Sequence, residues 1–152
     1  MTDRELNELL RYEAETGELF WKSNNKLAGH KHKSGYVNIK VRGKTYRAHR
    51  VIWAMVYGKF PDLIIDHING VPYDNRIQNL REVSVSVNQQ NQRQARKDNI
   101  GGLLGAHACH GKWASQIRVD GKLKYLGLFP TKEEAHEVYV QAKRHMHEGG
   151  TL

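Results

Sequence analysis

The clearest alternation of hydrophobic and polar positions runs from Gly35 to His49. Val37, Ile39 and Val41 alternate with polar residues, and Arg42-Gly43 then supplies a two-residue turn before the chain returns. A period of two is typical of a strand with one buried face, and this kind of turn is typical of a tight hairpin. The pattern therefore predicts a β-hairpin with an apolar inner face and a basic outer face.

Three other segments have the spacing of an amphipathic helix. They are Thr2–Tyr12, Ala48–Tyr57 and the segment that follows Thr131. The first and the last open with Thr-x-x-Glu, which is the pattern of a capping box at a helix N-terminus. We therefore predict three helices, each with one apolar stripe that faces a core.

The segment from Leu63 to about residue 92 predicts a compact ββα unit. An apolar strand runs directly into Asp66-His67, and a connection rich in Gly, Pro, Asn and Asp follows. A second strand over 79–84 then leads into a polar helix that starts near Ser86. Such a unit brings a carboxylate, an imidazole and side-chain amides together. These groups can hold a hard divalent cation and activate a water beside it.

The C-terminal part predicts a small antiparallel sheet of three strands. The strands are Gly105–Cys109, Lys112–Val119 and Lys122–Phe129, with turns at His110-Gly111 and Asp120-Gly121. Each turn places a polar residue before glycine, as two-residue hairpin turns require. We expect the last predicted helix to pack on this sheet.

The whole chain is predicted to be an α+β protein of two domains. We place residues 1–97 in the first domain and residues 98–152 in the second. The polar stretch 86–97 has almost no apolar stripe, so most of it cannot be a core helix. It is either a connector that lies along DNA or a frayed, exposed helix, and the sequence leaves both readings open.

The charge distribution points to a polyanionic partner. The 152 residues carry a formal net charge of +8, and residues 21–61 contain ten lysines and arginines but no acidic residue. Such side chains gain affinity by displacing counterions from phosphates. We therefore expect double-stranded DNA as the partner, with Lys40, Arg42 and Arg47 of the hairpin as contacts. The alternative is a basic face that is only solvated.

Composition also argues against several other classes of protein. The single cysteine, Cys109, excludes an internal disulfide, and with His107 and His110 it lacks a fourth ligand for zinc. No apolar run is long enough to span a bilayer, and the N-terminus does not read as a signal peptide. We therefore expect a cytoplasmic protein with no membrane partner and no small-molecule cofactor.

The polar residues of the ββα unit have a recognisable spacing. Asn79 follows His67 of the Asp66-His67 pair by twelve residues, and Asn88 follows nine residues later. With the phrases AHRVIWAMVYG and IDHINGVPYDNRIQNLREVS, this spacing resembles the HNH (His-Me finger) nucleases, especially phage- and intron-encoded homing endonucleases, over about residues 12–92. The resemblance implies a ββα-metal fold in which Asp66 and Asn88 bind one Mg²⁺ (or Mn²⁺) per active site. It further implies that His67 is the general base and that Asn79 orients it through the backbone.

Three expectations about this site come from the residues themselves. Neighbouring side chains of a strand point to opposite faces, so we expect a twist or bulge at Asp66-His67. Arg76 in the connecting loop is a candidate to clamp the scissile phosphate, with an exposed loop arginine as the alternative. His49 either contacts phosphate or active-site water, or is a hydrogen-bonded structural histidine.

The C-terminal segment has a resemblance of its own. Residues 101–147, with the phrase GKWASQIRVDGKLKYLGLFPTKEEAHEVY, are similar to the three-stranded DNA-binding domain of plant Apetala and ethylene-response factors. Lys112, Gln116 and Arg118 share one face of the middle strand and could enter the major groove, and the resemblance adds Tyr125. Several positions where the plant members place arginine are alanine or leucine here, which reduces readout by arginine.

These patterns together predict a metal-dependent DNA endonuclease that hydrolyses phosphodiester bonds. A monomer with one active site would nick one strand, whereas a homodimer could cut both. The alternative is a regulatory or architectural DNA-binding protein whose HNH scaffold no longer cuts. An enzyme with another kind of substrate is less supported, because the sequence has no cofactor loop and no nucleophile triad.

Overall fold

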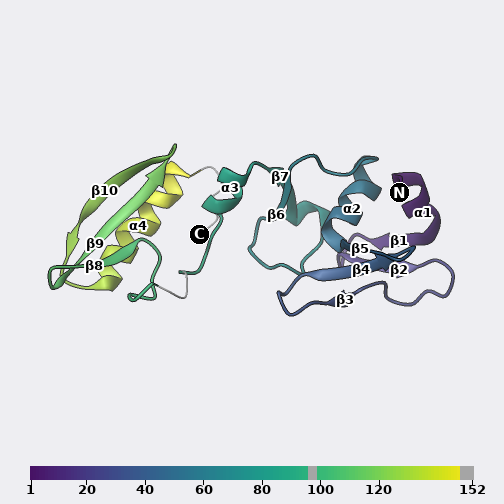
Figure 1. Ribbon diagram of the computed structural model, residues 1–152, viewed down its shortest axis with the longest axis horizontal. Helices are drawn as coiled ribbons and strands as arrows, with labels where there is room; N and C mark the ends of the chain where they lie inside the picture. Colours follow the sequence, from purple (N-terminus) through teal and green to yellow (C-terminus); the bar gives the residue numbers. More distant parts are fainter. Residues whose placement is uncertain (96–98, 148–152) are drawn as a thin grey trace. The chain divides into compact units, whose positions relative to one another are not determined.

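The chain divides into two compact units (Figure 1). The computed structural model describes residues 1–95 and 99–147, and the units are Met1–Val85 and Ser86–Leu152. The predicted boundary at Lys97/Asp98 lies outside the described residues. The division assigns residues 86–95 to the second unit, whereas the sequence analysis assigns them to the first.

The first unit consists of small antiparallel sheets packed around helices. Its strands pair as β1–β2, as β3–β4–β5 and as β6–β7. The elements in chain order are α1 (Asp3–Leu9), β1 (Leu10–Glu13), β2 (Glu18–Trp21), β3 (His30–Lys31), β4 (Val37–Val41), β5 (Lys44–Arg47), α2 (Ala48–Tyr57), β6 (Ile64–His67), the 3-10 helix η1 (Ile77–Asn79) and β7 (Leu80–Val83).

One hydrophobic core joins these elements. Leu6 of α1, Ile39 of β4 and Ile52 of α2 are fully buried, and Ile65 of β6 and Leu80 of β7 belong to the same cluster. Burial of each such side chain contributes about 1.5–3 kcal/mol. Because Ile65 precedes Asp66 and Leu80 is the strand partner of His67, this core fixes the position of the polar residues that follow.

Most of the predicted local elements of the first unit are confirmed. Helix α2 begins and ends at the predicted residues, and the hairpin turns at Arg42 and Gly43, both with positive φ. The first helix ends earlier than predicted, at Leu9, because Leu10–Glu13 pairs with β2 instead. The capping box of Thr2 is present.

Residues 68–76 connect β6 to η1, and we call them the site loop. The segment after this loop differs in detail from the prediction. The expected strand over 79–84 is preceded by the short 3-10 helix η1, and the strand itself is β7, Leu80–Val83. Helix α3 (Val85–Gln90) starts close to the expected residue, and none of its side chains is buried. This agrees with the absence of an apolar stripe in the sequence.

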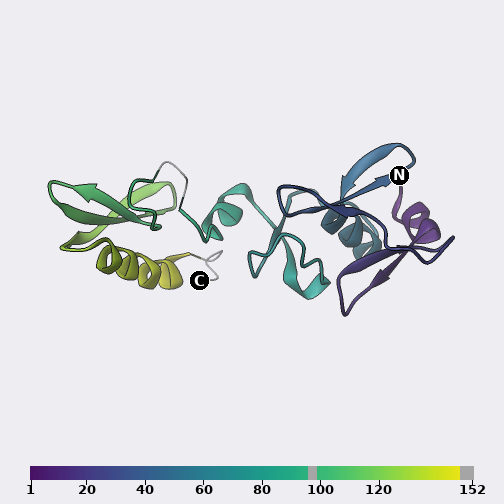
Figure 2. The ribbon, with the colours of Figure 1, turned by 90° about the horizontal axis from the view of Figure 1, so that it is seen from below.

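The second unit is a three-stranded antiparallel sheet covered by one helix. β8 (Ala106–Cys109), β9 (Lys112–Val119) and β10 (Lys122–Phe129) have the order β10-β9-β8. Helix α4 (Lys132–Met146) lies along one face of this sheet (Figure 2). The predicted sheet, its turns and the second capping box are therefore confirmed.

Helix α4 buries one side chain that its amphipathic pattern does not predict. Lys143 is 1% exposed, and its ammonium group donates a hydrogen bond to the backbone carbonyl of Gln92. Burial, with a smaller contribution from Arg93, lowers the pKa of Lys143 to about 8. No helix among the described residues, α4 included, is long and apolar enough to cross a membrane.

Candidate active site

Asp66 and His67 end strand β6 of the β6–β7 hairpin. Asp66 pairs with Arg81 and His67 with Leu80, without a shift of register. Of the expected twist or bulge, the bulge is therefore absent, and the two side chains leave on opposite faces of the hairpin. Both are buried, with 7% and 4% exposed, because each face supplies its own partners.

The carboxylate of Asp66 forms a buried ion pair with Arg81. Oδ2 of Asp66 accepts hydrogen bonds from Nε of Arg81 at 3.0 Å and from Nη2 at 2.8 Å. A buried carboxylate needs such a partner to stay charged. Arg81 does not stand out in the sequence, because only the strand register places it opposite Asp66.

The imidazole of His67 is held by Asn75, which is itself buried. Nε2 of His67 lies 3.1 Å from the amide Oδ1 of Asn75. Because an amide oxygen only accepts hydrogen bonds, Nε2 carries the proton and Nδ1 of the neutral ring keeps the lone pair. Burial lowers the pKa of His67, while Asn75 and the charges of Asp66 and Asp74 raise it by less. The ring is therefore neutral at neutral pH, and Nδ1 is its basic atom.

Two further rings contact His67. The centroid of His49 lies 5.1 Å from that of His67 with the rings perpendicular, and the centroid of Tyr36 lies 5.8 Å away. Burial lowers the pKa of His49 to about 3, and the neighbouring His67 adds to this effect. Nδ1 of His49 is buried and has no hydrogen-bond partner among the described residues. One alternative for His49 was a structural histidine held by hydrogen bonds. No such hydrogen bond is present at Nδ1 among the described residues.

Asn79 ties together the two ends of the site loop. Its Nδ2 donates to Oδ1 of Asn69 at 3.0 Å and to the backbone carbonyl of Asp74 at 2.7 Å. Its Oδ1 accepts from the backbone N–H of Asn69 at 3.0 Å. Asn79 thus holds the loop that carries Asn75, and Asn75 in turn holds the ring of His67. Asn75 was not predicted as a site residue, since the loop contains several asparagines and no periodicity distinguishes them.

Arg76 lies in the same loop and is engaged by Asp74. Nε and Nη2 of Arg76 donate to the two carboxylate oxygens of Asp74 at 2.7 and 2.6 Å. This pairing holds the pKa of Asp74 at about 2. The side chain of Arg76 is 42% exposed, so a role at the scissile phosphate stays a prediction.

The N-terminal hairpin braces the site loop from a distance of about sixty residues in sequence. Oη of Tyr12 donates to the carbonyl of Asn75 at 3.3 Å and accepts from the N–H of Ile77 at 2.8 Å. Gly17 packs directly on the loop, because a Cβ there would lie 2.6 Å from the backbone N of Arg76. The position of Asn75 therefore depends on the β1–β2 turn.

Residues 46–90 match the family model described as HNH endonuclease. The match indicates an HNH endonuclease domain. The matched segment contains Asp66, His67, Asn79 and Asn88, and it supports a ββα-metal nuclease fold and DNA as the substrate. No curated protein and no solved structure matches the chain.

HNH nucleases generally use a divalent metal ion. Over residues 1–95 and 99–147, no group of three or more His, Cys, Asp or Glu side chains is placed to hold one. A site with fewer protein ligands suits Mg²⁺, which keeps several waters and binds through one or two carboxylates. Asp66 is the carboxylate that fits, although Arg81 shares its Oδ2. Asn88, the other predicted ligand, lies on α3 in the second unit.

The basic face of the hairpin adjoins the histidines of the HNH domain. Lys40 is exposed on β4, and Arg42 pairs with Glu5. The guanidinium of Arg47 lies 4.9 Å from the ring centroid of Tyr36, the same ring that contacts His67. The three predicted DNA contacts of the hairpin therefore share one unit with His67, and their role stays a prediction.

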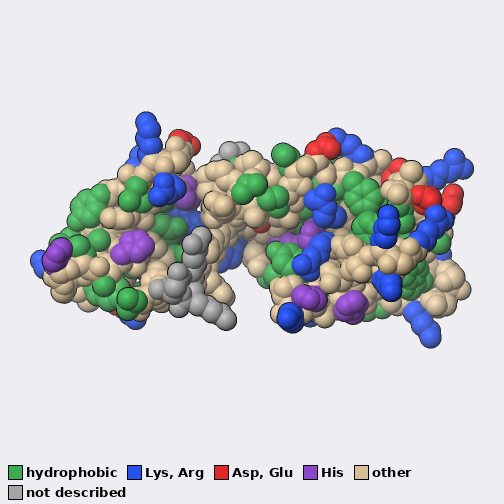
Figure 3. Space-filling view, viewed as in Figure 1, with side chains coloured by type: hydrophobic (Ala, Val, Ile, Leu, Met, Phe, Trp, Pro, Cys, Tyr) green, Lys and Arg blue, Asp and Glu red, His purple; other side chains and the backbone are tan. Residues whose placement is uncertain are grey.

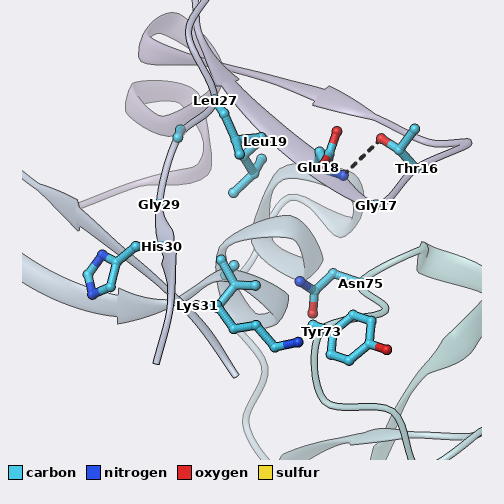
Figure 4. Close-up of a pocket in the computed structure, with 13 residues that line it drawn as sticks. Thr16, Gly17, Glu18, Leu19, Leu27, Gly29, His30, Lys31, Tyr73 and Asn75 are labelled. Carbon is cyan, nitrogen blue, oxygen red and sulfur yellow. Dashed lines mark hydrogen bonds between the residues drawn. The ribbon is translucent and has the colours of Figure 1, made fainter. Parts of the chain in front are cut away.

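A cavity of about 270 Å³ adjoins the loop that carries Asn75 (Figure 4). Its walls include apolar side chains such as Leu19 and Leu27. Nζ of Lys31 lies 3.7 Å from the ring centroid of Tyr73, and Figure 4 shows both side chains close to Asn75. The cavity therefore has a cation and an aromatic ring beside Asn75, the residue that holds His67. The sequence did not predict this cavity.

Gly17→Ala should destabilise the protein and lower DNA cleavage. Both Gly17 and Gly43 have positive φ, but a Cβ at Gly43 would meet nothing within 4 Å. Alanine at Gly43 should therefore cost only the strain of a left-handed residue, about 1–2 kcal/mol. Alanine at Gly17 should cost about 1–3 kcal/mol more, because the loop must move. Urea unfolding and plasmid cleavage measure both effects, and equal losses in the two variants would contradict the bracing role of Gly17.

Asn75→Ala should lower cleavage by a factor on the order of 10–100, the size of effect seen when the partner that orients a metal-binding histidine is lost. The hydrogen bond to Asn75 raises the pKa of His67, so its loss should move the acid limb of the pH–rate profile to lower pH. Asn75→Asp should move that limb to higher pH, because a carboxylate stabilises the imidazolium. A pH profile that is the same in both variants would show that Asn75 does not act on His67.

Proposed function

We propose that this protein is a metal-dependent DNA endonuclease of the homing type that hydrolyses phosphodiester bonds. Residues 1–97 form the catalytic HNH domain, and residues 98–152 form a DNA-binding domain similar to those of Apetala and ethylene-response factors. The observation that carries the proposal is the state of His67. It is a buried imidazole with a lowered pKa, and because its Nε2 is bonded to Asn75, Nδ1 is the basic atom of the neutral ring.

His67 acts as the general base on the attacking water. A base must be unprotonated at the working pH, and the lowered pKa of His67 meets this condition. Asn75 keeps the ring from rotating, and Asn79 fixes the loop on which Asn75 stands. The loop is also held by Tyr12, so that Nδ1 keeps one direction.

Asp66 and Asn88 are the residues that would hold Mg²⁺ (or Mn²⁺), one ion per active site. When bound, such an ion stabilises the charge that develops on the phosphate and on the leaving 3′ oxygen. Arg81 orients the carboxylate of Asp66 through two hydrogen bonds to one oxygen. Arg76, with Lys40, Arg42 and Arg47 of the hairpin, supplies positive charge toward the DNA backbone.

The second unit supplies further contact to double-stranded DNA through the sheet face that carries Lys112, Gln116, Arg118 and Tyr125. Lys112, Gln116 and Arg118 occupy alternate positions of β9, and Tyr125 is the cross-strand partner of Gln116. The protein acts in the cytoplasm, where its substrate is double-stranded DNA and no organic cofactor takes part. A monomer nicks one strand, and a homodimer cuts both.

Supercoiled plasmid distinguishes these outcomes in one assay. Wild-type protein with Mg²⁺ or Mn²⁺ should convert it to the nicked or linear form, and EDTA should stop the reaction. Nicked product alone indicates a single active site on the DNA, and linear product without a nicked intermediate indicates two acting together. No cleavage with either ion, at protein concentrations that bind the plasmid fully, would refute the endonuclease.

The second candidate function is a DNA-binding protein that does not cut. The observation that favours it is the pairing of Asp66 with Arg81, since the guanidinium already neutralises the carboxylate that would hold the metal. In that case the plasmid should be bound with a strong salt dependence but stay supercoiled with every divalent ion tested.

A further inference from the structure

An apolar stripe is exposed on strand β10 of the second unit. Leu123 is 56% exposed, Tyr125 is 62% and Leu128 is 43%. Leu123 is the cross-strand partner of Arg118, Tyr125 that of Gln116, and Leu128 that of Ala114. Cross-strand partners in an antiparallel pair lie on the same face of the sheet. We call this face the open face; its members used below are Lys112, Gln116 and Arg118 of β9 and Leu123, Tyr125 and Leu128 of β10.

The opposite face of the sheet already provides the core of this unit. Ala106, Ser115 and Ile117 alternate with the open-face positions, and they are buried together with Ala135 of α4. Figure 2 shows α4 along one side of the sheet only. The open face is therefore not required for folding, and Figure 3 shows hydrophobic side chains among histidine and basic ones over these strands.

The charge around the open face selects the kind of partner. β8, β9 and β10 contain no acidic residue, and Lys112 and Arg118 are exposed on the open face of β9, whereas Lys122 and Lys124 pair with Val119 and Ile117 of the opposite face. A surface with one sign of charge favours a polyanion. An apolar stripe flanked by cations on a two-stranded ribbon fits the major groove of DNA, which is wide enough to admit such a ribbon.

The chemistry of the open face matches one kind of base pair. A glutamine amide can bind both N6 and N7 of adenine, and apolar side chains contact the C5 methyl group of thymine. No hydrogen bond holds the side chain of Gln116 among the described residues, while Nη1 of Arg118 donates to the carbonyl of Gly121 at 2.8 Å. Arg118, whose guanidinium could bind guanine, is thus hydrogen-bonded to the hairpin turn.

We propose that the open face reads A·T base pairs, with Leu123 and Leu128 in contact with thymine methyl groups and Gln116 bonded to adenine. The second unit then gives the protein a preference for A·T-rich sites. This inference rests on the proposed role of the second unit in DNA binding, and it specifies which sequences that unit selects.

Replacing thymidine by deoxyuridine tests the proposal, because it removes the methyl group and leaves the phosphates and base pairing intact. The full-length protein is titrated, in EDTA, against three fluorescent duplexes of equal length: A·T-rich, the same sequence with deoxyuridine, and G·C-rich. The A·T-rich duplex should bind most tightly. Deoxyuridine should weaken binding by about 4-fold for each methyl contact, from the free energy of burying one such carbon.

Two variants assign the effect to the open face. Leu123→Ser/Leu128→Ser should bind the thymidine and deoxyuridine duplexes equally, while Val56→Ser, which changes an exposed residue of α2, should keep the discrimination. Lys112→Ala, at an exposed position of the open face, should weaken binding to all duplexes alike and lower the salt slope by about one unit, as loss of a phosphate contact does.

Equal affinity for the three duplexes overturns the proposal, and so does discrimination that survives in the double leucine variant. Neither result touches the endonuclease, which is measured separately as plasmid cleavage with Mg²⁺. If Lys112→Ala and the double leucine variant both bind every duplex like the wild type, the open face has no DNA role.

Discussion

His67→Ala should lower DNA cleavage by a factor of about 10²–10⁴ and leave DNA affinity nearly unchanged, because a general base acts on the rate of the chemical step. His67 is 4% exposed and its ring is fixed by Asn75, so alanine removes one positioned base. Single-turnover cleavage with saturating protein measures the chemical step apart from binding. Cleavage like that of the wild type would remove His67 from the mechanism.

The pH dependence provides a second measure of the same role. Burial lowers the pKa of His67 below the ordinary value, so the neutral form persists to lower pH than it would for an exposed histidine. The acid limb of the pH–rate profile should accordingly lie below pH 6.5 in the wild type and disappear in His67→Ala. Added imidazole should restore part of the rate to this variant. His145→Ala, at an exposed position of α4, is the matched control and should change neither profile nor rate.

Asp66→Asn should abolish cleavage supported by Mg²⁺, since it removes the only charged ligand proposed for the ion. The same change also breaks a buried ion pair with Arg81, and loss of one partner of such a pair costs about 3–5 kcal/mol. Unfolding must therefore be measured beside activity. Asn88→Ala should reduce cleavage less, and higher Mg²⁺ or Mn²⁺ should restore part of it, because a neutral amide contributes less to binding.

Arg81→Met separates the two roles of Asp66. If Asp66 serves only the ion pair, Asp66→Asn and Arg81→Met should lose stability and activity to a similar extent. If Asp66 binds the metal, Arg81→Met should keep cleavage at a lower Mg²⁺ requirement, because the carboxylate is no longer shared. The double variant Asp66→Asn/Arg81→Met buries no unpaired charge, so it should recover stability without recovering cleavage. Recovery of cleavage in the double variant would show that the metal is not held by Asp66.

Hydrophobic periodicity and turn residues are sufficient to predict the local elements of this protein. Helix α2 and strands β9 and β10 have the bounds that hydrophobic periodicity predicts. The turns at Arg42-Gly43 and Asp120-Gly121 take the positive φ values that their residues favour. These features depend on residues that are near neighbours in the chain, and so a linear pattern is sufficient to encode them. The spacing that leads from Asp66 to Asn79 is local in the same sense.

The contacts that hold the site form only when distant parts of the chain come together in the fold. Asn75 binds His67 because Tyr12 and Gly17, about sixty residues earlier, position its loop. Arg81 meets Asp66 through strand register, and Tyr36 and His49 reach His67 from separate elements. These contacts join residues of different elements, whereas hydrophobic periodicity relates only positions within one element. The pattern of polar and apolar positions therefore does not predict them. The packing of β6 and β7 on the common core brings them together.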